Sequence, residues 1–204
     1  MQPQTFIFFG RSGSGKGTQA ILLKQHLEKK AGGRKVLYVE TGARLREFIK
    51  KEYKTSQLTS DIMHAGGLLP EFIPIWIWTQ YLIENFTGEE HLILDGLSRR
   101  VAEAPVLDSA LRFYGFSGKE KKIVISINAS KEGCVKRLLG RGRPDDTRED
   151  IEERLSWYDT NVSPVLDYFK KNSEYIFLEI NGDQPIPKVH SEIVQKVFSS
   201  KVTS

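Results

Sequence analysis

Near its amino terminus the chain reads Gly10-Arg11-Ser12-Gly13-Ser14-Gly15-Lys16-Gly17-Thr18. The apolar run Thr5-Phe6-Ile7-Phe8-Phe9 precedes this stretch, and residues 19–27 follow it with apolar positions at helical spacing. This order predicts a strand, a glycine-rich loop and a helix. Glycines let the backbone curl closely around an anion, and the N–H groups at a helix start carry the positive end of its dipole. We therefore predict that the loop binds nucleotide phosphates, with Lys16 reaching the β- and γ-phosphates and the Thr18 hydroxyl facing a Mg²⁺ shell.

The composition is typical of a globular protein that accepts anionic ligands. The chain has 204 residues and a formal net charge of +4, and this length suits one domain with room for a small inserted lobe. Cys134 is the only cysteine, which excludes an intramolecular disulfide and a zinc site built from clustered cysteines. We see no signal pattern before Gly10 and no apolar run near the roughly 18 residues that a membrane span needs. We therefore expect a cytoplasmic protein with no membrane partner.

Four further apolar runs predict strands, at residues 36–40, 91–96, 121–127 and 174–180. Helical patterns separate these runs, and parallel neighbours in a sheet require such crossover connections. The sequence therefore predicts an α/β fold with a five-stranded, mainly parallel, doubly wound sheet. No internal repeat, low-complexity stretch or linker divides the chain.

Polar residues occur where several of these strands end. Asp95 ends the third strand, where open α/β sheets place ligands, and could hold a Mg²⁺ water beside the glycine loop. Thr41 is placed to cap the following helix, whose first turns carry Arg46. Thr147 with Asp150 forms a capping box at the start of a later helix. Arginines in loops or helix starts after strands are Arg46, Arg99, Arg137, Arg141, Arg143 and Arg154. Phosphoryl transfer between two nucleotides needs many fixed positive charges, so this set suits such a reaction.

Several motifs in order along the chain resemble those of the adenylate kinase family. Gly15-Lys16-Gly17-Thr18-Gln19 is similar to that family's loop, because Gly17 separates the lysine from the threonine. Thr41-Gly42 with Arg46 resembles the monophosphate-binding motif, and residues 61–68 resemble the stretch that leads to backbone contacts with the acceptor base. Asp95-Gly96 with Arg99 resembles the family's Asp-Gly-Phe-Pro-Arg, although Leu97-Ser98 replaces Phe-Pro. The arginines at 137, 141, 143 and 154 resemble the lid and hinge set.

This resemblance implies a P-loop NTPase fold and reversible, Mg²⁺-dependent transfer, ATP + AMP = 2 ADP. It implies a helical monophosphate-binding insertion at about residues 41–70 and a short lid loop at about 140–147, without zinc. The partners would be the small-molecule nucleotides ATP and AMP and no nucleic acid, and the protein would act as a monomer.

The resemblance also implies roles for individual residues. The implied catalytic residues are Lys16, Arg99, Arg141, Arg143 and Arg154. The implied ATP-binding residues are Gly10, Arg11, Ser12, Gly13, Ser14, Gly15, Lys16, Gly17, Thr18, Arg137, Arg141 and Gln184. The implied AMP-binding residues are Thr41, Gly42, Arg46, Gly67, Leu68, Leu69, Gly96, Arg99, Glu103, Arg143 and Arg154. Mg²⁺ would bind through water near Thr18 and Asp95.

Glu103 departs from the family pattern, in which a glutamine reads the AMP base. A carboxylate only accepts hydrogen bonds, whereas an amide both donates and accepts. Adenine offers the acceptor N1 beside its amino group, whereas guanine offers two donors. Either Glu103 contacts only the adenine amino group or the acceptor base is not adenine; alternatively, Glu103 turns to solvent and the Leu69 backbone selects the base. Thr41 matches adenylate kinases and favours AMP.

Two alternative functions remain open at the level of sequence. The first is a kinase for GMP or a pyrimidine monophosphate. The second is a P-loop ATPase or nucleic-acid-binding factor that uses the basic residues from Arg137 to Arg143 on a phosphate backbone. No aromatic residues alternate with these basic ones, which argues against a base-stacking surface.

Overall fold

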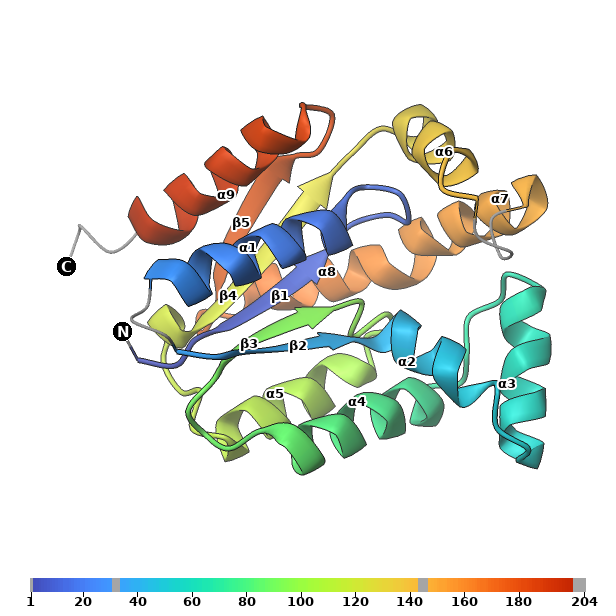
Figure 1. Cartoon of the computed structure of the whole chain (residues 1–204), viewed down its shortest axis with the longest axis horizontal. Coiled ribbons are helices and arrows are strands. Elements are labelled where there is room, and N and C mark those ends of the chain that lie inside the picture. Colours follow the sequence, from blue (N-terminus) through green and yellow to red (C-terminus); the bar gives the residue numbers. More distant parts are fainter. Residues whose placement is uncertain (1, 31–33, 143–146, 200–204) are drawn as a thin grey trace.

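A computed structural model describes residues 2–30, 34–142 and 147–199 of the chain. Within these residues, five parallel strands form one sheet in the order β2-β3-β1-β4-β5 (Figure 1). The strands are β1 Thr5–Phe9, β2 Val36–Glu40, β3 His91–Asp95, β4 Lys122–Asn128 and β5 Ile176–Asn181. The parallel, doubly wound sheet predicted from the sequence is confirmed, and all its strands end on the same edge.

Helices connect the strands and cover both faces of the sheet (Figure 1). The α-helices are α1 Lys16–Lys30, α2 Thr41–Phe48, α3 Lys54–His64, α4 Phe72–Asn85, α5 Glu103–Phe113, α6 Lys131–Leu139, α7 Arg148–Trp157, α8 Ser163–Lys171 and α9 Ile186–Ser199. A 3-10 turn, η1 Lys119–Lys121, precedes β4, and a π-helical segment, η2 Tyr158–Val162, joins α7 to α8. In the described part of the chain, no helix is both long enough and apolar enough to cross a membrane.

Alternate residues of each buried strand face opposite layers of the core, as the two-residue period of a strand requires. On β1, Phe6 and Phe8 pack in a cluster with residues of α1 and α9. Ile7 and Phe9 belong to the other cluster, which contains residues of α4, α5 and α8. Both faces are therefore covered by helices, which explains why the strands read as continuous apolar runs.

Two predicted caps have different outcomes. Thr147 caps α7 as expected, because its Oγ1 accepts a hydrogen bond from the Asp150 N–H at 3.1 Å. The prediction that Thr41 caps the helix after β2 is wrong. Glu40 occupies the cap position and Thr41 is already helical, because β2 passes into α2 without an intervening loop. The Thr41 hydroxyl is consequently buried, with no hydrogen-bond partner among the described residues.

The carboxyl ends of the strands lie at the right of Figure 1, between two groups of helices. The pair α2 and α3 lies on one side of this end, and α6 with α7 lies on the other (Figure 1). A separate small cluster of buried residues links α2 to α4; it contains Leu45, Phe48, Leu69, Ile73 and Ile77. The segment from 41 to 70 thus packs on α4 rather than on the sheet.

Two neighbouring residues of α4 test the assignment of its buried face. Leu82 is 1% exposed and belongs to the core, whereas Ile83 is 72% exposed. We expect Leu82→Ala to lower the free energy of unfolding by about 2 to 5 kcal/mol, because the truncation leaves a cavity. Ile83→Ala should change it by less than about 0.5 kcal/mol. Urea unfolding of both variants measures the difference, and equal losses would contradict this packing.

Candidate active site

The glycine-rich loop after β1 is shaped by close contact with α6. Gly13 has a φ of +78°, which L-residues rarely adopt. A Cβ atom at Gly13 would lie 2.6 Å from the Cys134 carbonyl oxygen of α6. The Ser14 N–H donates to the Arg11 carbonyl at 3.0 Å, which closes the turn ahead of α1. The loop therefore presents its backbone at the start of α1, as an anion site requires.

Lys16 is the first residue of α1 and folds back over this loop. Its Nζ donates to the Arg11 carbonyl oxygen at 3.1 Å. Burial lowers the pKa of Lys16, while the negative charge of Asp95 opposes that shift. A desolvated ammonium group interacts strongly with a phosphate that replaces its lost water.

Asp95 at the end of β3 lies beside Lys16 in the same buried environment. Burial raises the pKa of Asp95, whereas Lys16 and the hydrogen bond from the Tyr38 hydroxyl, at 3.1 Å, oppose the shift. A Cβ atom at Gly17 would lie 3.4 Å from the Asp95 Oδ2. The carboxyl group of Asp95 therefore lies next to the start of α1 and the loop that precedes it.

A cavity of about 510 Å³ extends from the loop toward α3 and α4. The residues predicted for the site that line it are Ser12, Gly13, Gly15, Lys16, Gly17, Thr18, Thr41, Gly42, Arg46, Gly67, Leu68, Leu69, Asp95, Gly96, Arg99, Glu103, Arg137, Arg141 and Arg154. One end is formed by the glycine-rich loop and the other by residues around Leu69. The volume falls within the range of small-molecule sites.

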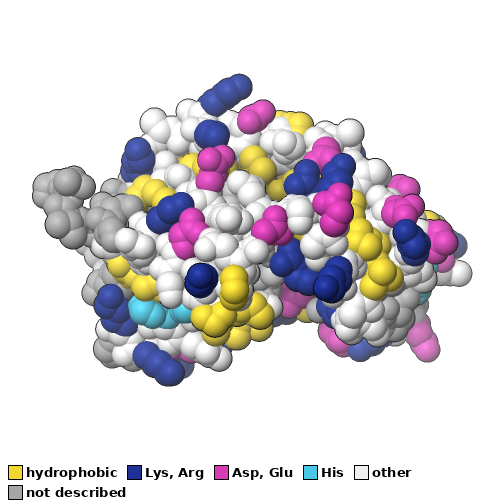
Figure 2. All heavy atoms as spheres, turned by 90° about the horizontal axis from the view of Figure 1, so that it is seen from above, with side chains coloured by type: hydrophobic (Ala, Val, Ile, Leu, Met, Phe, Trp, Pro, Cys, Tyr) yellow, Lys and Arg dark blue, Asp and Glu magenta, His cyan; other side chains and the backbone are white. Residues whose placement is uncertain are grey.

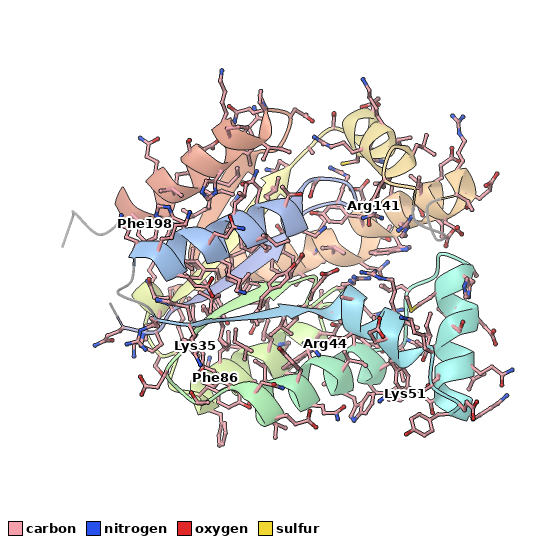
Figure 3. All side chains as sticks on the ribbon, in the orientation of Figure 1. Lys35, Arg44, Lys51, Phe86, Arg141 and Phe198 are labelled. Carbon is pink, nitrogen blue, oxygen red and sulfur yellow. The ribbon has the colours of Figure 1, made fainter. Side chains whose placement is uncertain are left out.

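Arginines from separate elements line this cavity, each held by contacts of its own. Arg46 Nη2 pairs with Glu40 Oε1 at 3.0 Å, and Arg99 Nε donates to the Gly96 carbonyl at 3.3 Å. Arg154 Nε donates to the Asp150 carbonyl at 3.1 Å, and Arg137 Nη1 donates to the Gly182 carbonyl at 3.2 Å. Figure 3 labels Arg141 on the α6 side of this end of the molecule.

These cations lie close enough to influence one another. Burial lowers the pKa of Arg99, and the positive charges of Arg154 and Arg46 lower it further. The negative charges of Glu103 and Asp95 have the opposite effect. Seen from above in Figure 2, several Lys and Arg side chains lie near one another, beside acidic ones, in the half of the molecule that contains α6 and α7 in Figure 1. An anionic ligand would relieve the repulsion between the clustered arginines.

Four predicted residues do not line the main cavity. Gly10 and Ser14 shape the loop from behind, and a Cβ at Gly10 would lie 2.5 Å from the Ser14 Oγ. Arg11 Nη2 pairs with Asp159 Oδ1 at 2.6 Å. The Gln184 amide donates to the Asn181 carbonyl at 3.2 Å and to Glu192 at 2.8 Å. Arg143 and part of the predicted lid loop lie outside the described residues.

Other lining residues were not predicted from the sequence. Trp157, at the end of α7, lines the cavity, and its Nε1 donates to the Gly66 carbonyl at 3.0 Å. Tyr38 and Glu40 also line it and hold Asp95 and Arg46 in place. The position of Tyr38 and Glu40 at the end of a strand was a usable signal, whereas nothing in the local sequence distinguished Trp157 from a core residue.

The residues around Asp95 suit a Mg²⁺ ion that arrives with a nucleotide. No group of three or more His, Cys, Asp or Glu side chains positioned to hold a metal occurs in the described ranges. Mg²⁺ usually keeps several waters and binds through one or two carboxylates together with substrate phosphates. The single carboxyl group of Asp95, with Thr18 on the same cavity, fits that mode of binding.

A phosphate-binding loop, a carboxyl group at the end of β3 and a cage of arginines around one cavity define a P-loop phosphotransferase. Residues 8–174 match the family model described as adenylate kinase. Adenylate kinase 1 of Nostoc sp. is 33% identical over 187 residues, which cover 92% of this chain and 95% of that protein. The adenylate kinase of Chloroherpeton thalassium is 32% identical over 225 aligned positions, which cover 95% of this chain and 98% of that protein.

A strain of Prochlorococcus marinus has an adenylate kinase 35% identical over 187 residues, which cover 92% of this chain and 94% of that protein. The chain therefore belongs to the adenylate kinase family and is a nucleoside monophosphate kinase. Nothing in these relatives favours the alternative of a nucleic-acid-binding factor.

Two loop glycines separate the effect of backbone strain from that of a steric clash. Gly13 and Gly15 both have positive φ, +78° and +98°, but a Cβ at Gly15 would have no atom within 4 Å. We expect Gly13→Ala to lower the melting temperature more than Gly15→Ala, because the first also collides with α6. Thermal unfolding of both variants without nucleotide measures this. Equal losses would contradict the contact between the loop and α6.

Proposed function

We propose that the protein transfers the γ-phosphoryl group of ATP to AMP and produces two molecules of ADP. The observation that carries this proposal is the convergence of Lys16, Arg46, Arg99 and Arg154 on one cavity between the glycine-rich loop and the segment at Leu69. A site for two nucleotides needs positive charge at the point where their phosphates meet.

The donor ATP would occupy the end of the cavity formed by the glycine-rich loop. Backbone N–H groups of the loop and the start of α1 would bind its phosphates, and Lys16 would leave the Arg11 carbonyl to reach the β- and γ-phosphates. Arg137 and Arg141, on the same side, would neutralise further phosphate charge. The role of Gln184 near the adenine would require its amide to exchange its present partners.

The acceptor AMP would occupy the other end. Arg46 and Arg99 are positioned for its phosphate, because a Cβ at Gly42 would lie 3.4 Å from Arg46 Nη1 and 3.9 Å from Arg99 Nη2. Met63, Leu68 and Leu69 would surround its base, since these apolar residues line that end. Thr41, with a buried and unpaired hydroxyl, gains a partner if AMP binds beside it.

In the transfer step an AMP phosphate oxygen forms a bond to the γ-phosphorus as the bond to the bridging oxygen of ATP breaks. Arg99, Arg141, Arg143 and Arg154 would hold their charges around the transferring group. Protein contributes mainly position and charge to such a reaction. When Mg²⁺ is bound it neutralises charge on the transferring phosphates, and Asp95 and Thr18 would hold it through water.

Two segments would exclude water during transfer. The insertion at about residues 41–70 packs on α4 through its own small cluster, and the lid at about 140–147 joins α6 to α7. Closure of both over the nucleotides would keep the phosphoryl group from water. We further propose that the protein acts in the cytoplasm as a monomer, on free nucleotides rather than on nucleic acid or membranes.

The direct test is ATP consumption with Mg²⁺ in the presence of AMP, GMP, CMP, UMP or dTMP, each diphosphate product being followed separately. The proposal predicts ADP formation with AMP as the preferred acceptor. Preference for GMP or a pyrimidine monophosphate would overturn the assignment of AMP.

Lys16 and Arg99 should carry much of the charge stabilisation. We expect Lys16→Ala and Arg99→Ala each to lower kcat by about 10²-fold or more, because each removes a preorganised cation from the cavity. The control is Lys24→Ala, which alters an α1 lysine paired with Glu28 outside the cavity. Circular dichroism establishes that each variant is folded, and near-normal turnover in either cavity variant would contradict its role.

The proposed metal site predicts a strict need for Mg²⁺. Removing the ion with excess chelator should abolish ADP formation, and added Mg²⁺ should restore it. Asp95→Asn should raise the Mg²⁺ concentration that gives half-maximal rate, because it removes the negative charge from the site. An unchanged Mg²⁺ dependence in this variant would argue against Asp95 as a metal-binding residue.

A further inference from the structure

The acceptor end of the cavity contains a buried carboxyl group whose hydrogen bonding is incomplete. Glu103 is the first residue of α5, is 1% exposed and lines the cavity. Its Oε1 accepts a hydrogen bond from the Arg100 N–H at 3.1 Å. Its Oε2 is buried and has no hydrogen-bond partner among the described residues. Because native proteins rarely leave a buried polar atom unpaired, this oxygen is a candidate for contact with a ligand.

The surroundings of Glu103 contain opposing charges. Arg99 and the backbone N–H groups of Arg99 and Arg100 favour the anion, as does the start of α5. Burial and the negative charge of Glu71 favour the neutral acid. The Arg100 side chain is partly occupied elsewhere, since it pairs with Glu71 at 3.6 Å and donates to the Leu68 carbonyl at 3.3 Å. Burial has the largest effect, and the pKa of Glu103 is raised.

A neutral carboxylic acid has the same hydrogen-bonding pattern as an amide, with one donor beside one acceptor. The N–H of Arg100 fixes Oε1 as the accepting oxygen, so the acid proton belongs on Oε2. Oε1 keeps a second lone pair for another donor. The neutral side chain therefore matches adenine, which presents the acceptor N1 beside its 6-amino donor. The ionised side chain matches guanine instead, which presents two adjacent donors.

We propose that Glu103 selects the acceptor base through its protonation state, as a neutral acid that donates from Oε2 to adenine N1 and accepts at Oε1 from the 6-amino group. The ionised form loses this match and favours guanine. This inference rests on the proposed function, which places the acceptor base among Met63, Leu68 and Leu69, on the same wall of the cavity. It accounts for a glutamate in an adenine-binding position without turning the side chain to solvent.

The variant Glu103→Gln provides the test, because glutamine offers the same donor and acceptor at every pH. Its side-chain oxygen can still accept from the Arg100 N–H, so the start of α5 keeps its bond. We would measure kcat/KM for AMP and for GMP over roughly pH 5 to 9, the range in which buried glutamates titrate. We then divide kcat/KM of the original protein by kcat/KM of the variant at each pH. In this ratio, the titration of the nucleotides and of the other site residues cancels.

For AMP, this ratio should be constant at low pH and should fall by up to tenfold per pH unit above the Glu103 pKa. For GMP, it should rise over the same range. Glu84→Gln makes the same chemical change on an exposed part of α4 and should give a ratio that does not vary with pH. Glu71→Gln removes a charge that raises the Glu103 pKa. In a protein that carries this change, the kcat/KM ratio for AMP should therefore begin to fall at lower pH.

Calorimetry of AMP binding gives a readout that does not depend on turnover. In buffers of different ionisation enthalpy at alkaline pH, the original protein should take up more protons on binding AMP than Glu103→Gln does. Equal proton uptake, or a ratio for AMP that does not vary with pH, would overturn this role of Glu103 even if AMP is a good substrate. Failure to phosphorylate any monophosphate would instead overturn the proposed function.

Discussion

The structure depends on a small set of charges at the end of β3, where the buried carboxyl group of Asp95 interacts with the partly buried cations Lys16 and Arg99. Burial alone shifts the pKa of all three toward the neutral form, and Asp95 opposes that shift for both cations. The three carboxyl groups that line the cavity, those of Glu40, Asp95 and Glu103, do not balance its five arginines and Lys16. The site is therefore built with an excess of positive charge, and nucleotide phosphates with their metal ion supply the missing negative charge. Because these cations have lost part of their hydration, they gain free energy when they pair with phosphates, and this favours nucleotide binding.

Strand order brings the charges of this set together. β1 lies in the centre of the sheet, and its register pairs Phe8 with Asp95 of β3. The loop after β1 and the carboxyl group after β3 therefore emerge side by side, although more than seventy positions separate them in the sequence. The loop after β1 leads to α1 on one face of the sheet and the loop after β3 leads to α5 on the other face, which creates the crevice where α/β sheets bind ligands. The acceptor segment, residues 41–70 in the crossover from β2 to β3, and α6, in the crossover from β4 to β5, flank this crevice.

Features that depend on neighbouring residues, and motifs that occur in a fixed order, could be predicted from the sequence. The strands, the loop between Gly10 and Thr18 and the cap at Thr147 follow from residues near one another in the chain. The Thr41 cap was wrong because it assumed a loop after β2, whereas β2 passes directly into α2 and Glu40 takes the cap position. Trp157 escaped prediction because only the tertiary fold brings its indole to Gly66. For the same reason the burial of Glu103 could not be read from its sequence neighbours, although its departure from the family pattern could.

The helix α7 connects the two ends of the cavity into one frame. It carries Arg154 into the site, and Trp157 at its end donates to the Gly66 carbonyl in the acceptor segment. The π-helical segment that follows holds Asp159, which pairs with Arg11 of the glycine-rich loop at 2.6 Å and with Lys131 of α6 at 3.0 Å. A displacement of α7 must therefore change contacts at the donor loop and at the acceptor segment together. An enzyme that transfers a group between two bound nucleotides needs both ends placed relative to one another, and this helix couples them without a separate domain.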